Sequence, residues 1–325
     1  MSLLKRAVLA AAIALAVFAA LPASAQQWPT KPVKFIVPFP PGGSVDPLAR
    51  LLGIKLSESL GQQFVVENRA GASGSLGTGV AARSPADGYT FVFVFDTHAV
   101  NPALMPDLPF NTEKDLAPVM LVGTAPMAIA TKADKPYKSF TDVVTAAKAK
   151  PDTLTYGSVG SGSLGHLAVT LLQQPAGIRL VHVPYRGGGP MTQDALGGHI
   201  ELAIGSVAVL SSHMKAGTLR PIVQTGAKRS HVIPNVPTLA ESGIPGFSAV
   251  AWWGIFAPTG TPEPIMEKFH AELVKAINLP DVKKTLTETL GMNVEASSRA
   301  DLQKFLASEM ARWTKVVKDN NIKAE

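Results

Sequence analysis

Hydrophobic residues follow two alternating periodicities along the chain. Short runs rich in β-branched and aromatic residues predict strands, and between them apolar residues recur at helical spacing, as Leu48, Leu52 and Leu56 do. The predicted strands span 33–38, 64–67, 89–95, 116–131, 153–158, 180–183, 200–204, 219–224 and 248–256. The predicted helices span 48–60, 140–149, 164–174, 190–196, 264–277 and 299–320, with a small-residue helix after the glycine-rich segment 70–79. Strands alternating with helices predict an α/β fold with βαβ units and mostly parallel sheets.

Two extended apolar runs differ from the other predicted strands in length. Residues 120–131 and 248–258 both exceed the typical strand of about 5–6 residues, so each is long enough to cross from one domain to another. Two crossings predict a discontinuous first lobe, 26–123 plus 252–325, and a second lobe, 124–251. A cleft between two α/β lobes joined by two crossover strands is typical of binding proteins. The alternative is one large single-sheet domain.

The N-terminal segment has the pattern of an export signal. Lys5 and Arg6 precede an apolar run over 7–21, and an Ala-Ser-Ala sequence ends at Ala25. This pattern predicts a signal peptide over 1–25, cleavage after Ala25 and a periplasmic protein. A membrane anchor is the alternative, but the run is shorter than the roughly 20 residues that span a bilayer. No later stretch is long and apolar enough to span one.

Composition excludes several functional classes. The 325 residues are 46% hydrophobic and 17% charged, against about 25% charged in an average protein, and they include no cysteine. Disulfide scaffolds, thiolate metal sites and cysteine nucleophiles are therefore excluded. The net charge of +6 is not clustered, so no nucleic-acid partner is expected. No metal-binding motif is present, and we expect neither a metal nor a cofactor.

Two glycine- and serine-rich segments lie between a predicted strand and a predicted helix. The first is Pro38–Asp46, with Gly42 and Gly43, and the second is Tyr156–His166, which adds three serine hydroxyls. The first N–H groups of a helix have no partner within it, and the helix dipole favours a negative charge there. Facing one another across a cleft, the two loops would bind the two ends of a small anion. The alternative is that these residues only form turns and helix caps.

Enzymatic interpretations find less support. Gly160, Gly162 and Gly165 match a dinucleotide fingerprint, but the acid expected about 20 residues later is absent. No G-x-S-x-G elbow is present. An exported α/β enzyme acting on a small carboxylate, with His166 or Asp96 as the base, remains the alternative function. A regulatory effector-binding domain is disfavoured because the N-terminus carries an export signal in place of a DNA-binding segment.

Motifs spread along the chain carry a family resemblance. The first is the loop sequence Phe39-Pro-Pro-Gly-Gly-Ser-Val-Asp46 with Ala49-Arg50. The others are Glu67-Asn-Arg-Ala-Gly71, Ala86-Asp-Gly-Tyr-Thr90, Thr97-His98 with Asn101-Pro102, Gly160-Ser-Gly-Ser163 with His166-Leu167, Val183-Pro-Tyr-Arg-Gly187, Leu196-Gly-Gly198, Val236-Pro-Thr238, and Trp253-Gly254 with Ala257-Pro258 and Thr261-Pro262. In this order they resemble the Bug receptors, the extracytoplasmic solute-binding proteins of tripartite tricarboxylate transporters.

The resemblance implies a two-lobed, type II periplasmic-binding-protein fold that closes on its ligand. It further implies that backbone N–H groups and hydroxyls of the two loops hold a carboxylate. The implied ligand-binding residues are Phe39, Gly42, Gly43 and Ser44 in the first loop, Ser158, Gly160, Ser161, Gly162 and Ser163 in the second, and Thr97, His98, Gly205 and Ser206 in the cleft wall. Asp96 and Pro175 depart from the family pattern. An acid at position 96 would repel a second carboxylate nearby and favour an ammonium group.

The expected function is therefore capture of a small organic carboxylate in the periplasm. The resemblance implies delivery to the membrane subunits of a tripartite tricarboxylate transporter, with a sensor as the alternative partner. We expect a monomer that does not catalyse a reaction. Dicarboxylates, aromatic acids, amino acids and nicotinate-like compounds all suit a site built from generic anion donors.

Overall fold

The computed structural model describes residues 28–323. The predicted signal peptide over 1–25 and its cleavage site after Ala25 lie outside these residues. Within 28–323, no helix combines the length and the apolar character needed to cross a bilayer.

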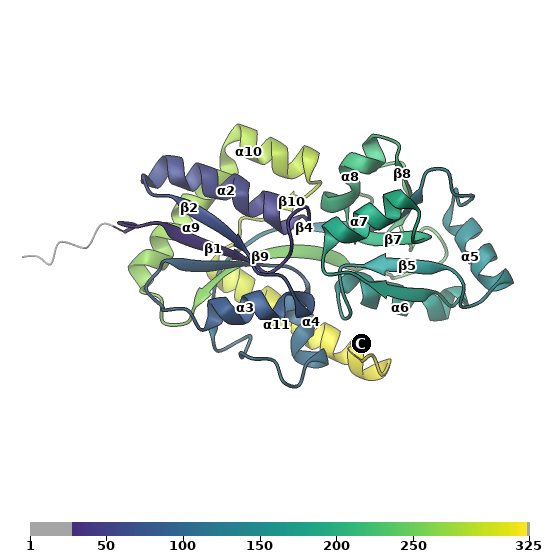
Figure 1. Ribbon diagram of the computed structural model, residues 1–325, viewed down its shortest axis with the longest axis horizontal. Coiled ribbons are helices and arrows are strands. Elements are labelled where there is room, and N and C mark those ends of the chain that lie inside the picture. The colour runs from purple at the N-terminus through teal and green to yellow at the C-terminus, as the bar shows by residue number, and fades with distance from the viewer. Residues whose placement is uncertain (1–27, 324–325) are drawn as a thin grey trace, which may run out of the picture.

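Ten strands build the sheet at the centre of the molecule (Figure 1). They are β1 (Val33–Val37), β2 (Phe64–Asn68), β3 (Thr90–Val94), β4 (Leu116–Lys132), β5 (Thr155–Ser158), β6 (Val181–Pro184), β7 (Leu202–Ser206), β8 (Leu219–Gln224), β9 (Val250–Pro258) and β10 (Asn293–Val294). Their order is β2-β1-β3-β9-β4-β7-β5-β6, and β8 and β10 also pair with β4.

Strand β4 belongs to both halves of this sheet. We call the half with β1, β2, β3, β9 and β10 sheet A and the half with β5–β8 sheet B. The first part of the 17-residue β4 pairs with β9 as far as Pro126, and from Met127 it pairs with β7. Pairing is parallel among β1–β3 and β5–β7 but antiparallel at every strand that contacts β4. The result is a mixed α/β fold of two lobes, less parallel than the pattern predicts.

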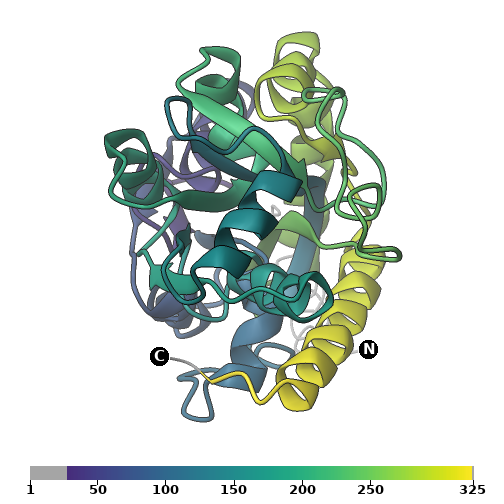
Figure 2. The same cartoon turned by 90° about the vertical axis from the view of Figure 1, so that its right-hand side faces the viewer.

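Helices cover both faces of the two half-sheets. They are α2 (Val45–Leu60), α3 (Ser75–Ala82), α4 (Thr97–Leu104), α5 (Phe140–Ala149), α6 (Leu164–Ala176), α7 (Gly188–Gly197), α8 (Val207–Lys215), α9 (Glu263–Asn278), α10 (Pro280–Lys284) and α11 (Arg299–Asp319), with short turns η1 (Ala72–Gly74) and η2 (Thr285–Thr289). Helix α4 is not among the predicted helices. It forms despite Pro102, because it packs on α11 and buries Ala99 and Val100 (Figures 1 and 2).

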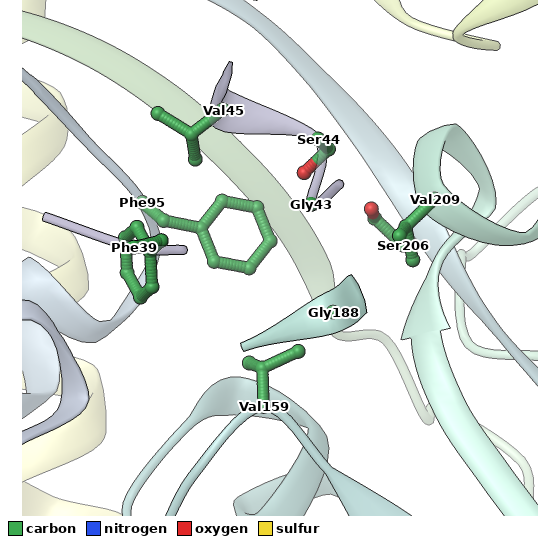
Figure 3. A pocket seen from close by; sticks show the side chains of 9 residues that line it. All are labelled: Phe39, Gly43, Ser44, Val45, Phe95, Val159, Gly188, Ser206 and Val209. Carbon is green, nitrogen blue, oxygen red and sulfur yellow. The ribbon is translucent and has the colours of Figure 1, made fainter. Parts of the chain in front are cut away.

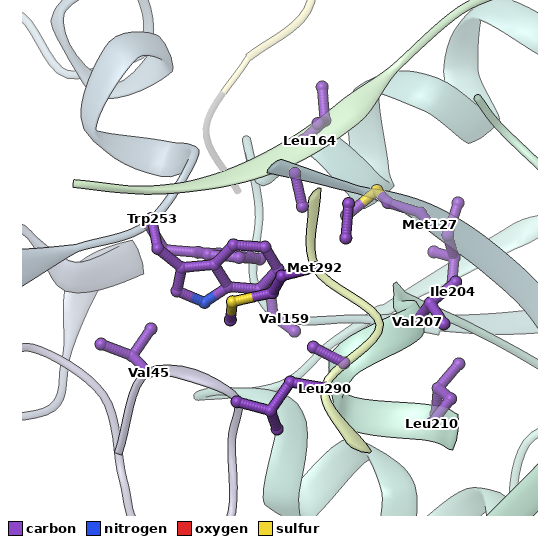
Figure 4. Close-up of a cluster of buried hydrophobic side chains, with 14 of the residues drawn as sticks. Val45, Met127, Val159, Leu164, Ile204, Val207, Leu210, Trp253, Leu290 and Met292 are labelled. Atoms are coloured by element: carbon purple, nitrogen blue, oxygen red, sulfur yellow. The ribbon is translucent and has the colours of Figure 1, made fainter. Parts of the chain in front are cut away.

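One hydrophobic core continues from sheet A into sheet B. In sheet A it is aromatic, and the rings of Phe91 and Phe269 lie 3.8 Å apart between centroids. Between the halves, Trp253 approaches the side chains of Leu290 and Met292, and Met127 and Ile204 continue the cluster into sheet B (Figure 4). The loops of both halves extend from strands that this buried core holds together.

Candidate binding site between the two half-sheets

A pocket lies where the N-termini of α2, α7 and α8 converge. Nine residues line it: Phe39, Gly43, Ser44, Val45, Phe95, Val159, Gly188, Ser206 and Val209 (Figure 3). The cavity enclosed among them is about 20 Å³, which is enough for one water molecule, so the two sides of the site are nearly in contact in this structure.

Glycines allow two loops to approach one another at the backbone. Gly42 has a φ of +87°, a left-handed conformation that glycine adopts without strain. A Cβ atom added to Gly43 would lie 3.7 Å from the backbone nitrogen of Gly188, and one added to Gly189 would lie 2.8 Å from the carbonyl oxygen of Pro41. The loop before α2 therefore packs directly against the start of α7, which belongs to sheet B. The structure is closed at this seam.

The polar groups of the pocket are hydroxyls and helix N-termini. The Ser44 hydroxyl accepts a hydrogen bond from the Trp253 indole nitrogen at 3.1 Å. The Ser206 hydroxyl is buried and has no partner among the described residues, and it lies on the same side of the pocket as Ser44 (Figure 3). The nine lining residues carry no charge. An anion would therefore be stabilised by helix dipoles and hydrogen-bond donors alone.

The acid in the first turn of α2 points away from this pocket. The Asp46 carboxylate accepts hydrogen bonds from Arg50 Nε at 3.1 Å and from Asn68 Nδ2 at 2.9 Å. Asn68 also donates to the carbonyl oxygen of Phe39 at 3.0 Å. Because Arg50 neutralises the carboxylate and Asn68 anchors the loop, the start of α2 can face an anion.

The second predicted loop forms most of its hydrogen bonds within itself. The Gly162 N–H donates to His166 Nδ1 at 3.0 Å, and the Ser163 N–H donates to the Gly160 carbonyl at 3.1 Å. Ser163 caps α6 by accepting from the His166 N–H, and its hydroxyl donates to Ser158. Of this loop, only Val159 lines the pocket.

The Asp96 side chain joins the end of β3 in sheet A to the start of α6 in the other half. It follows β3, it is only 1% exposed, and its Oδ1 accepts a 3.4 Å hydrogen bond from the N–H of Leu164, the first residue of α6. Its Oδ2 has no partner among the described residues. Burial raises the pKa of this carboxyl well above its usual range, despite the N–H groups of Leu164 and Thr97.

The predicted site residues therefore fall into two groups. The pocket includes Phe39, Gly43, Ser44 and Ser206, and Gly42 and Gly205 adjoin it in the chain. Ser158, Gly160, Ser161, Gly162, Ser163, Thr97 and His98 are not among its lining residues.

The position of His98 has a packing explanation. The His98 ring lies 4.9 Å from Phe256 and 6.2 Å from Phe110 between centroids, on the face of α4 that packs into the protein. Burial lowers the pKa of His98 to about 3, so this imidazole is neutral at physiological pH.

Sequence reasoning missed five lining residues: Val45, Phe95, Val159, Gly188 and Val209. Gly188 carried a usable signal. After β6, Gly187 caps α7 and Gly188 and Gly189 begin it, so the three glycines form a third glycine-rich junction between a strand and a helix. The apolar residues had no such signal, because pocket walls and core have the same composition.

His166 of α6 and His182 of β6 take part in structural contacts. The rings of His166 and His182 stack at 4.0 Å with an interplanar angle of 3°, and His182 Nε2 lies 2.7 Å from the hydroxyl of Ser158. Neither histidine nor Ser158 is among the residues that line the pocket. Among residues 28–323, no three metal-ligating side chains cluster together.

Comparison with known proteins gives a consistent result. Residues 48–322 match the model of the tripartite tricarboxylate transporter family receptor, TctC. Protein BugT of Bordetella pertussis is 36% identical over 306 residues, covering 94% of each chain. Two solved structures cover 92% and 89% of this chain and 100% of their own. They are R. palustris Rpa4515 with adipate, at 33% identity and TM-score 0.88, and MatC from Rhodopseudomonas palustris with bound malate, at 32% and 0.84.

Proposed function

Because the chain belongs to the tripartite tricarboxylate transporter receptor family, we propose that it captures a small organic carboxylate in the periplasm and delivers it to the membrane subunits of such a transporter. The observation that carries the proposal is the convergence of three helix N-termini on a pocket without charged side chains. The ligands named for Rpa4515 and MatC, adipate and malate, are both carboxylates.

Binding replaces the water around a carboxylate with fixed donors of the protein. The starts of α2, α7 and α8 present N–H groups and the positive ends of their dipoles, and the hydroxyls of Ser44 and Ser206 add two donors. The starts of α7 and α8 lie on sheet B, whereas α2 belongs to sheet A. A ligand that contacts both sides stabilises the closed form by its differential affinity for the two states.

The proposal includes a division of the chain and a cellular route. We assign 26–123 with 252–325 to the lobe around sheet A, and 124–251 to the lobe around sheet B. Removal of 1–25 would release the mature protein into the periplasm, where it acts as a monomer. The closed pair of lobes is then the surface that the membrane subunits recognise.

We also propose that the protein releases its ligand chemically unchanged. The alternative enzyme requires His166 or Asp96 as a base. His166 Nδ1 already accepts the N–H of Gly162, and Asp96 is buried between the lobes, so neither side chain lines the pocket.

The test is a thermal-shift screen of the refolded, ligand-free protein against mono-, di- and tricarboxylates, aromatic acids and acidic amino acids. A ligand at 100 times its dissociation constant stabilises the folded state by about 2.7 kcal/mol, which raises the melting temperature by several degrees. Ser206→Asp places a negative charge in the pocket and should abolish the shift. Ser212→Asp, at an exposed position of the same helix, is the matched control. Silence across the panel, or conversion of the acid, would contradict the proposal.

A further inference from the structure

A second contact between the two half-sheets lies outside the pocket. The turn η1 follows β2 of sheet A, and Ser161 lies in the loop after β5 of sheet B. The Ser73 hydroxyl of this turn donates a hydrogen bond to the Ser161 carbonyl oxygen at 2.7 Å. Neither residue lines the pocket, so this bond joins the two halves without using the groups that face the pocket.

The turn that carries Ser73 has an unusual backbone. Ala72 and Ser73 have φ angles of 45° and 49°, and between positions 28 and 323 they are the only adjacent non-glycine residues with positive φ. Residues with a side chain rarely adopt this left-handed conformation, and it persists where the surrounding structure holds it. Asn101 Nδ2 donates to the Ser73 carbonyl at 3.1 Å, and the Gly74 N–H donates to the Gly71 carbonyl at 3.0 Å. Both donors belong to the sheet A half, so neither bond depends on sheet B.

Glycines in the loop after β5 leave room for this turn and for α4. A Cβ atom added to Gly160 would lie 2.8 Å from Ser73 Oγ, and one added to Gly162 would overlap Cδ1 of Leu104. Gly160 and Gly162 also have φ angles of +135° and +75°, at which a side chain is strained. The loop is therefore shaped to receive the sheet A half.

On the basis of the proposed function, we propose that Ser73 is a positioning residue for closure of the two lobes. Its hydroxyl stabilises the closed form through the bond to Ser161, and it raises ligand affinity without touching the ligand. When the lobes separate, water replaces each partner of this bond. A hydrogen bond of this kind changes the ratio of closed to open protein by about 3- to 10-fold, and ligand affinity changes by the same factor where the closed form is the one that binds.

The absence of cysteine from the chain allows closure to be measured directly. Ser59→Cys in α2 and Gln193→Cys in α7 place one spin label on an exposed position of each half. Pulsed electron paramagnetic resonance then gives the distribution of distances between the labels, without ligand and with each acid of the carboxylate panel. Adding Ser73→Ala should lower the ratio of short to long distances by about 3- to 10-fold and raise the dissociation constant of each acid that binds by the same factor.

Two further variants separate the hydroxyl from other effects. Ser84→Ala removes a serine hydroxyl whose hydrogen bond, to the Val80 carbonyl, stays within the sheet A half, and it should leave the distances unchanged. Ser73→Gly suits the left-handed turn but lacks the hydroxyl, so it should match Ser73→Ala. Wild-type distances in Ser73→Gly would assign the effect of alanine to the backbone of the turn and would overturn the inference.

The outcomes for Ser73 and for the proposed function are distinct. Identical distances in the wild type and in Ser73→Ala would overturn the role of Ser73, and binding of an acid would still support the proposed function. Binding of no acid would contradict the proposed function, whereas a changed distance distribution would still support the role of Ser73 in closure. A melting temperature within a degree or two of the wild type shows that Ser73→Ala is folded.

Discussion

Substitution of Gly189 by alanine should prevent closure without unfolding either half of the protein. Gly189 is the second residue of α7, where alanine is a better helix former by up to about 1 kcal/mol. In the closed structure, however, the new Cβ would lie 2.8 Å from the backbone oxygen of Pro41, against 3.4 Å for an ordinary contact. Neither a helix start nor a loop backbone can rotate this contact away, so the seam must open.

The cost of such overpacking is about 1–3 kcal/mol, and it falls on the closed form alone. Ligand affinity should therefore fall about 5- to 150-fold, while the melting temperature without ligand stays within a degree or two. Calorimetry with the tightest-binding acid of the screen measures the first effect, and thermal unfolding measures the second. Gln193→Ala, at an exposed position of the same helix, is the control. Wild-type affinity in Gly189→Ala would refute the assignment of this seam to the liganded state.

Three further predictions concern groups around the pocket. Because burial raises the pKa of Asp96, the folded state holds a proton that the unfolded state releases, so stability should fall as pH rises from about 4 toward the raised pKa. Asp96→Asn should remove this fall in pH-dependent melting curves. An unchanged curve would contradict the raised pKa of Asp96. Ligand binding should change the fluorescence of Trp253, whose indole donates to Ser44, and Trp253→Phe should abolish that change; a signal that persists would come from another tryptophan. Asn68→Ala removes the donor to the Phe39 carbonyl and should destabilise the protein by about 1–3 kcal/mol in urea unfolding and weaken ligand binding. Unchanged stability and unchanged affinity would show that Asn68 does not anchor this loop.

Local sequence determined most of the secondary structure. The helix over Phe140–Ala149 and the strand over Leu219–Gln224 match their predicted bounds, because their apolar periodicity and end residues agree with their tertiary surroundings. Helix α4 is the exception. It is not among the predicted helices, and its packing against α11 outweighs the unfavourable helix propensity of Pro102.

The candidate site was predictable only in part, for a related reason. Gly43 and Ser44 follow from turn chemistry, since a glycine turn before a helix exposes N–H groups wherever it occurs. The second loop, 158–163, has the same chemistry. Its N–H groups donate to acceptors within the loop, and the Leu164 N–H that follows donates to Asp96. The acceptors of the internal bonds are local residues, such as Ser158 and His166, whereas Asp96 reaches this loop only through the tertiary fold.

The sequence by itself therefore determined the element types, the α/β class, the family resemblance and the presence of helix starts able to bind an anion. Only the tertiary structure decided which of these starts face the same space. That choice depends on the close approach of Gly189 to Pro41 and on the position of Asp96 at the start of α6. The physical reason is that an N–H group that already donates within the protein is not free to donate to a ligand. The Leu164 N–H is such a group, and its acceptor, Asp96, lies 68 residues away in the sequence.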